Sequence, residues 1–264
     1  MSDSEKRFSS ALIAYAAGDA FGAFYEFSEI VSEVPNELRE KKDWPYGGTS
    51  DDTSLTILTL LALAKVSPEE AAQSFYELLQ ANQESLRGLG PTTRAALGKQ
   101  VHEKEIDSIG FTNGAMMRTA LLGLVFQDDS VRDAWVRSLS STTHRSYAVE
   151  SSVALARAFT EGKLEINDSW ERDNQGVSND ATVTLHALGH VLSQAVTPLD
   201  AMQVSCSLGG DTDTVAALSA SLIASLPGNY ERVFEIPWLQ QVDWNGIQGF
   251  TAALEVVFAR MEKR

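Results

Sequence analysis

The stretch GGDTDTVAALSASLIASL, residues 209–226, decides the fold. Two glycines are followed by alternating Asp and Thr, and then by small and apolar residues from Thr214 to Leu226 that end at Pro227-Gly228. A helix that is apolar on nearly all sides belongs in the core of a protein. Small residues along it allow neighbouring helices to pack closely. The stretch therefore predicts a buried helix with carboxylates at its start.

A second stretch, GGTSDDT at residues 47–53, has the same pattern of two glycines followed by Asp and hydroxyl-bearing residues. It precedes another apolar helix, which is predicted from Thr53 to Val66. Each loop alone is explained equally well by helix capping, because Asp is favoured at a helix start. However, adjacent carboxylates near an apolar helix repel each other unless donors or a cation compensate them. Two such loops favour a site for a hard cation such as Mg²⁺, Mn²⁺ or Ca²⁺, because oxygen ligands without nearby Cys or paired His disfavour zinc.

Helical spacing recurs along most of the chain, and strand signals are almost absent. The first helix is predicted to stop at Gly18-Asp19, and another to begin at Pro68 with Ser67 as cap and Glu70 closing a capping box. Further helices are predicted over 92–101, 115–126, 131–139, 147–159, 181–195, 198–206 and 246–264. With no internal repeat or linker, the chain is predicted to be all-α, a compact orthogonal helical bundle forming a single domain over 1–264.

Composition limits the possible partners and location. The chain has 264 residues, 21 Lys+Arg and 36 Asp+Glu, for a formal net charge of −15, which repels nucleic-acid phosphates, so no nucleic acid is expected. The most apolar segment, 55–66, is too short to cross a bilayer, so no membrane partner is expected either. A lone Cys206 excludes an intrachain disulfide, and the start MSDSEKR lacks a signal's apolar run. We expect a cytoplasmic protein.

Several features that suggest binding have simpler structural interpretations. His186 and His190 are one helical turn apart, but their segment lacks the glutamate of a metalloprotease motif, so a structural pair is favoured. The loop 88–93 is predicted to be a turn with Thr caps rather than a phosphate-binding loop. A set of aromatic residues is predicted to pack in the core rather than to stack on adenine, namely Tyr15, Phe21, Phe24 and Tyr25.

Five separated motifs make a more specific pattern: Gly18-Asp19-Ala20-Phe21-Gly22 with Glu26 downstream, Ser50-Asp51-Asp52-Thr53, Asn113-Gly114-Ala115-Met116-Met117-Arg118, Thr143-His144, and Gly209-Gly210-Asp211-Thr212-Asp213-Thr214. Together they resemble the motifs of the ADP-ribosylglycohydrolase family, in the same order and over most of the chain. The resemblance implies an all-α bundle. It also implies a hydrolase that attacks the anomeric carbon of the distal ribose and releases ADP-ribose from arginine, serine or a related acceptor.

The resemblance also implies roles for individual residues. Glu26 or a carboxylate of the metal cluster, such as Asp52, would be the catalytic base. Two Mg²⁺ or Mn²⁺ ions would be coordinated by Ser50, Asp51, Asp52, Asp211, Asp213 and Thr214. ADP-ribose or an ADP-ribosylated protein would be bound by Asp19, Gly22, Asn113, Gly114, Ala115, Met116, His144, Gly209 and Gly210. From the residues alone, Asn113-Gly114 could equally be an ordinary turn, and a lone histidine such as His144 is by default a cap or surface residue.

The chain departs from the family pattern at three places. Ser50 replaces a threonine, which keeps the hydroxyl, and Arg145-Ser146-Tyr147 replaces a segment that commonly contains proline. Gly88 stands where relatives often have an aspartate. The loss of that acid favours an alternative, a non-catalytic ADP-ribose-binding or structural member of the family. A two-metal hydrolase of another nucleotide or phosphoester is a third possibility.

Overall fold

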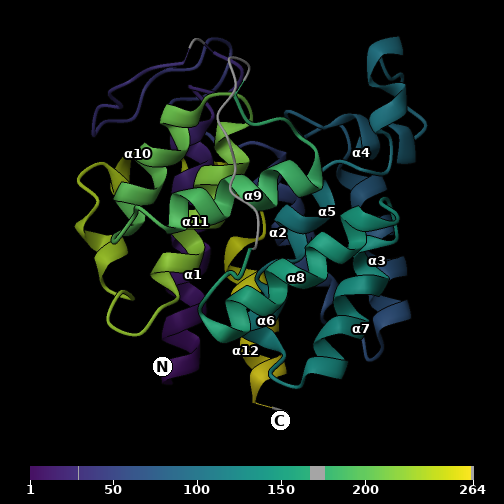
Figure 1. Ribbon diagram of the computed structural model, residues 1–264. Coiled ribbons are helices and arrows are strands. Elements are labelled where there is room, and N and C mark those ends of the chain that lie inside the picture. The colour runs from purple at the N-terminus through teal and green to yellow at the C-terminus, as the bar shows by residue number, and fades with distance from the viewer. Residues whose placement is uncertain (29, 167–175, 263–264) are drawn as a thin grey trace.

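The computed structural model describes residues 1–28, 30–166 and 176–262, and these ranges form an all-α fold (Figure 1). No strand occurs in them, although isolated bridges join Thr112 to Asp180 and Val177 to Gly210. The α-helices are α1 (Asp3–Gly22), α2 (Asp51–Ala62), α3 (Pro68–Asn82), α4 (Pro91–Ala96), α5 (Gly114–Thr119), α6 (Leu122–Val125), α7 (Asp129–Ser140), α8 (Tyr147–Glu161), α9 (Ala181–Leu192), α10 (Pro198–Leu208), α11 (Thr212–Ala224) and α12 (Phe250–Met261). Short 3₁₀ helices are η1 (Glu103–Ser108), η2 (Arg232–Glu235), η3 (Leu239–Gln241) and η4 (Trp244–Gly246). The predicted all-α class is confirmed.

The centre of the fold is the packing of α1 along α11, beside α10 (Figure 1). Every residue of α11 is buried, as its apolar sequence predicted. The prediction that the first helix stops at Gly18-Asp19 was wrong, because α1 continues to Gly22. A Cβ at Gly18 would lie 2.6 Å from the carbonyl oxygen of Ala216 on α11. Gly18 therefore permits close helix packing rather than ending the helix.

Other predicted boundaries also differ from those in the structure. The predicted helix 115–126 is divided into α5 and α6, and Gly123 on α6 approaches α8 so closely that a Cβ there would lie 1.9 Å from the Ala156 oxygen. Ser67 caps α3 as predicted, but Glu70 Oε2 accepts from the Val66 N–H at 3.2 Å, one residue before the expected partner. The last helix begins only at Phe250, after η4.

The apolar core lies between the helices. Tyr15, Phe21 and Tyr25 are buried, and the Phe21 ring stacks on Trp238 with centroids 5.0 Å apart. The core interpretation of these rings is confirmed, while Phe24 packs against the core from a partly exposed position. Cys206 is a free, buried thiol. No helix in the described ranges has the length and apolar character needed to span a membrane.

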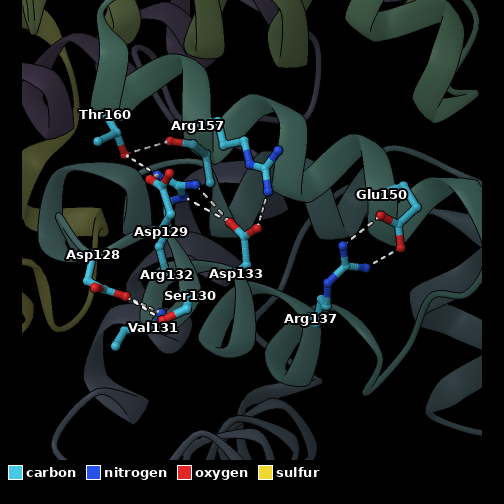
Figure 2. A network of polar contacts seen from close by, with 11 residues as sticks. Asp128, Asp129, Ser130, Val131, Arg132, Asp133, Arg137, Glu150, Arg157 and Thr160 are labelled. Atoms are coloured by element: carbon cyan, nitrogen blue, oxygen red, sulfur yellow. Dashed lines mark hydrogen bonds and ion pairs between the residues drawn. The ribbon is translucent and has the colours of Figure 1, made fainter.

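Ion pairs join α7 to α8 (Figure 2). Arg132 of α7 has a side chain only 1% exposed, and it contacts Asp129 at 2.8 Å and Asp133 at 2.9 Å. Arg157 of α8 also pairs with Asp133, and Figure 2 shows Arg137 of α7 facing Glu150 of α8 with two contacts. Burial opposes ionisation of Asp133, but its bonds to Arg157 and Arg132 lower its pKa overall. This network fixes α7, and thus the turn that follows it, which carries His144.

Candidate active site and metal centre

The first turns of α2 and α11 bring their carboxylates to one pocket. Ser50 is the N-cap of α2, and Asp51 and Asp52 form its first turn; Asp211 is the N-cap of α11, with Asp213 next to it. These segments are far apart in the chain, so the tertiary fold creates the cluster. The acidic cluster in the pocket consists of Glu26, Asp51, Asp52, Asp211 and Asp213, with Thr214 beside it, and a further acid, Glu105, lines the pocket outside this cluster.

Burial makes this cluster electrostatically costly without a cation. Desolvation, followed by repulsion from neighbouring carboxylates, raises the pKa of Asp51, Asp52 and Asp213 well above the usual range. Burial also raises the pKa of Asp211, to about 6, although its hydrogen bond from Asn113 opposes the shift. Within the described part of the chain, Asp52 Oδ2 is buried and has no hydrogen-bond partner. A bound cation would compensate all of these groups.

Helix capping accounts for only part of the cluster. Ser50 Oγ accepts from the Asp52 N–H at 3.0 Å, so α2 is capped by serine rather than by its acids. The Asp211 side chain makes no capping bond to α11; instead its Oδ2 accepts from Asn113 Nδ2 at 2.5 Å. Oxygens of Glu26, Asp211 and Asp213 lie within 4.8 Å of one another. This all-oxygen donor set, with the unpartnered Oδ2 of Asp52 in the same pocket, fits a hard divalent cation.

Asp19 supports the start of α2 from behind the pocket. It is fully buried, and its carboxylate accepts from the backbone N–H of Ser50 at 2.9 Å. It also accepts from the N–H of Thr53 at 3.0 Å and from the Thr53 hydroxyl at 2.6 Å. Burial raises the pKa of Asp19, although these hydrogen bonds lower it. Asp19 thus holds the Ser50-Asp51-Asp52 turn in place.

Glu26 follows the end of α1 and lines the pocket. Its N–H donates to the Gly22 oxygen at 3.1 Å, and its carboxylate forms an ion pair with Lys41 Nζ at 2.6 Å. The next residue, Phe27, is 65% exposed with φ of 49°, and its N–H donates to the Gly210 oxygen at 2.8 Å. The segment after α1 is therefore tied to the loop before α11.

His144 lies behind the 113–114 turn in a chain of polar contacts. Arg118, fully buried, donates to the Thr143 hydroxyl at 3.2 Å, and that hydroxyl contacts His144 Nδ1 at 2.7 Å. His144 Nε2 lies 3.1 Å from the hydroxyl of Thr112, which lines the pocket. Burial and then the charge of Arg118 lower the pKa of His144 to about 3, so the ring is neutral. A Cβ at Gly114 would lie 3.2 Å from this ring.

The remaining predicted residues differ in position. Asn113 and Gly114 line the pocket, whereas Ala115 and Met116 are fully buried and Met117 lines it instead. Four of the predicted substrate-binding residues are not part of the pocket lining, namely Asp19, Gly22, Gly209 and Gly210. A Cβ at Gly22 would lie 2.5 Å from Asp213 Cα, and one at Gly210 would lie 2.1 Å from the Val177 oxygen. The binding roles assigned to all of these residues stay predictions.

Sequence reasoning missed part of the pocket wall. The loop 88–93 leads into α4, but Gly90 is the N-cap and has no side-chain cap bond, so the predicted Thr caps were wrong. Gly88 has φ of +85°, and a Cβ there would lie 3.1 Å from Asp51 Oδ1, so an acid at this position would join the cluster. The further lining residues are Phe27, Leu89, Gly90, Pro91, Thr93, Arg94, Glu105, Thr112, Met117 and Asn179. These residues carry no local sequence pattern, and only the fold brings them to the pocket.

Comparisons with known proteins agree with this architecture. A family model described as ADP-ribosylglycohydrolase matches residues 1–177. No curated protein matches. Among solved structures, one titled "ADP-ribosylglycohydrolase-related protein complex" is similar, with a TM-score of 0.69 and 22% identity, and the alignment covers 99% of this chain and 100% of that chain. At this level of identity the structural likeness shows the shared fold.

Proposed function

This chain belongs to the ADP-ribosylglycohydrolase family, and we propose that it is a metal-dependent hydrolase that cleaves the glycosidic bond between ADP-ribose and a modified acceptor. Membership of the family supports a hydrolase acting on ADP-ribose linkages. One observation carries the proposed dependence on metal. Asp51, Asp52, Asp211 and Asp213 are buried in one pocket with raised pKa values, and Asp52 Oδ2 has no partner among the described residues.

The proposed metal ligands are the oxygens that meet at the starts of α2 and α11. We assign two Mg²⁺ or Mn²⁺ ions to Ser50, Asp51, Asp52, Asp211, Asp213 and Thr214. When bound, such ions orient substrate oxygens and stabilise negative charge. Of these residues, Ser50 does not line the pocket, and its hydroxyl already accepts from the Asp52 N–H. Ser50 would therefore need a second lone pair of its hydroxyl for coordination. Glu26 lies within reach of Asp211 and Asp213 and is a further candidate ligand.

The proposed chemistry is hydrolysis at the anomeric carbon of the distal ribose. The carboxylate of Glu26 accepts a proton from water, whose oxygen bonds to the anomeric carbon as the glycosidic bond breaks. The electron pair of that bond leaves with the acceptor, which takes up a proton from solvent, and Glu26 then returns its proton to solvent. Lys41 compensates the charge of Glu26 before the proton arrives. Asp52, with its unpartnered oxygen, is the alternative base.

A non-catalytic ADP-ribose-binding protein is the second candidate, and Gly88 favours it. A carboxylate at position 88 would stand beside Asp51, and this chain lacks one. If that acid is the base in relatives, the pocket here would bind ADP-ribose without cleaving its linkage.

Release of ADP-ribose from arginine-linked, serine-linked and O-acetyl substrates, with Mg²⁺ or with EDTA, tests the proposal. We expect release from at least one substrate with Mg²⁺ and loss of release with EDTA. Binding of ADP-ribose with no release from any substrate would favour the non-catalytic candidate. Equal release with and without metal would refute the metal dependence.

A further inference from the structure

An ion pair outside the acidic cluster lines the same pocket. Arg94 of α4 contacts Glu105 of η1, with Nη2 and Oε2 2.8 Å apart, and both residues line the pocket. Their side chains are 23% and 27% exposed. A partly exposed pair is held weakly compared with a fully buried one, because water screens its charges. A ligand with stronger acceptors can therefore compete for Arg94.

Arg94 is the one cationic side chain among the described residues that line this pocket. The ionisable side chains on the same walls are otherwise acidic, namely Glu26, Asp51, Asp52, Glu105, Asp211 and Asp213. Lys41 pairs with Glu26 but is not part of the lining. Arg94 Nε is also buried without a hydrogen-bond partner in the described ranges. The protein therefore leaves this guanidinium only partly hydrogen-bonded.

Arg94 lines the same pocket as the acidic cluster, on the wall formed by α4. The neighbouring residue, Thr93, places its hydroxyl 3.8 Å from where a Cβ of Gly114 would stand. Gly114 and Asn113 line the pocket, and Asn113 bonds directly to Asp211 of the cluster. The wall that carries Thr93 and Arg94 is thus linked to the acidic cluster through the 113–114 turn, and one ligand in this pocket can contact both.

We infer that Arg94 recognises the diphosphate of ADP-ribose and that Glu105 competes with this ligand for the guanidinium. This inference rests on the proposed function. A diphosphate needs positive charge on a wall that is otherwise acidic, and a guanidinium offers paired donors that match phosphate oxygens. Glu105 Oε2 also accepts from the His102 N–H at 3.2 Å, so Glu105 is held in place while Arg94 exchanges partners.

Calorimetric titration of ADP-ribose in the presence of Mg²⁺ tests the inference. Arg94→Gln should raise the Kd about ten-fold, the scale of one lost charge-assisted hydrogen bond. Arg94→Lys should restore only part of the affinity, because an ammonium lacks the paired geometry. Arg87→Gln is the matched control, since Arg87 is exposed and lines a different pocket. It removes the same charge and should leave the Kd near that of the wild type.

Glu105→Gln should have the opposite effect. The amide oxygen can still accept from the His102 N–H, but the competing charge is gone, so the Kd should fall roughly two- to five-fold. A Kd for Arg94→Gln equal to that of Arg87→Gln, or weaker binding by Glu105→Gln, would overturn this inference while wild-type hydrolysis stood. Absence of ADP-ribose binding by the wild type would overturn both proposals. Binding without hydrolysis would refute only the hydrolase.

Discussion

Glu26 is the residue on which the proposed chemistry depends most. Its carboxylate lies between Lys41 and the oxygens of Asp211 and Asp213. Glu26→Gln keeps the size of the side chain but removes its basicity, so turnover should fall at least 100-fold while the affinity for ADP-ribose changes less. Steady-state kinetics paired with ADP-ribose titration would separate the two effects. Turnover equal to that of the wild type would eliminate Glu26 as the base and direct attention to Asp52.

His144 gives a prediction about pH. Burial, with the charge of Arg118, lowers its folded pKa to about 3, whereas an unfolded histidine titrates near 6.5. The unfolded state therefore binds the proton first, so this contribution to stability is present above pH 6.5 and is lost as pH falls toward 3. At pH 5 the loss should be about 2 kcal/mol relative to pH 7.

His144→Gln provides the reference for that measurement. The amide cannot titrate, so denaturant unfolding of both proteins at the two pH values isolates the histidine from the acidic cluster. The free-energy difference between wild type and variant should change by about 2 kcal/mol from pH 7 to pH 5. A difference that does not vary with pH would mean that His144 titrates as an exposed histidine.

At the scale of elements, the contact between α1 and α11 depends on glycine. Gly18→Ala would place a Cβ 2.6 Å from the Ala216 oxygen, so the helices must separate. We expect a loss of about 2 kcal/mol in the free energy of unfolding. Ser9→Ala, at a partly exposed position on the same helix, is the control and should change stability little. Equal stability of the two variants would show that α1 and α11 can move apart without cost.

The starts of helices could be predicted from the sequence better than their ends. Ser67-Pro68 and the residues before Pro198 carry local cap chemistry, and α3 and α10 begin where that chemistry placed them. The end of α1 could not be predicted from the local sequence. Gly18 is glycine because it packs against Ala216, on a helix nearly 200 positions later in the chain, and not because the helix ends there. Likewise, the sequence does not show that Gly123, inside α6, lies against Ala156 of α8.

In the candidate site, too, residues with a local sequence pattern could be predicted, and residues placed by tertiary contacts could not. The acids of the two loops could be recognised because glycine, Asp and Thr recur beside an apolar helix in each. Arg94 and Glu105 carry no local pattern, and only the tertiary fold brings their pair to the pocket. The substrate-binding role of Asp19 stays a prediction; what the sequence did not indicate is that its carboxylate holds the start of α2 through Ser50 and Thr53.

At the scale of the whole molecule, the fold brings together acids that the chain separates by more than 150 positions. The family match covers residues 1–177, so Asp51 and Asp52 lie within it, whereas Asp211 and Asp213 lie beyond it. The structure places the two pairs in one pocket. The central claim is that this convergence forms a metal centre rather than two capped helices.

Calorimetric titration of Mg²⁺ into the wild type and the Asp211→Asn/Asp213→Asn variant, with ADP-ribose release measured on the same samples, tests that claim most directly. The substitutions remove charge while nearly preserving shape, and Asn caps a helix about as well as Asp. We therefore predict a folded variant with greatly weakened Mg²⁺ binding and no detectable release of ADP-ribose. Mg²⁺ affinity and turnover that match those of the wild type would contradict the account.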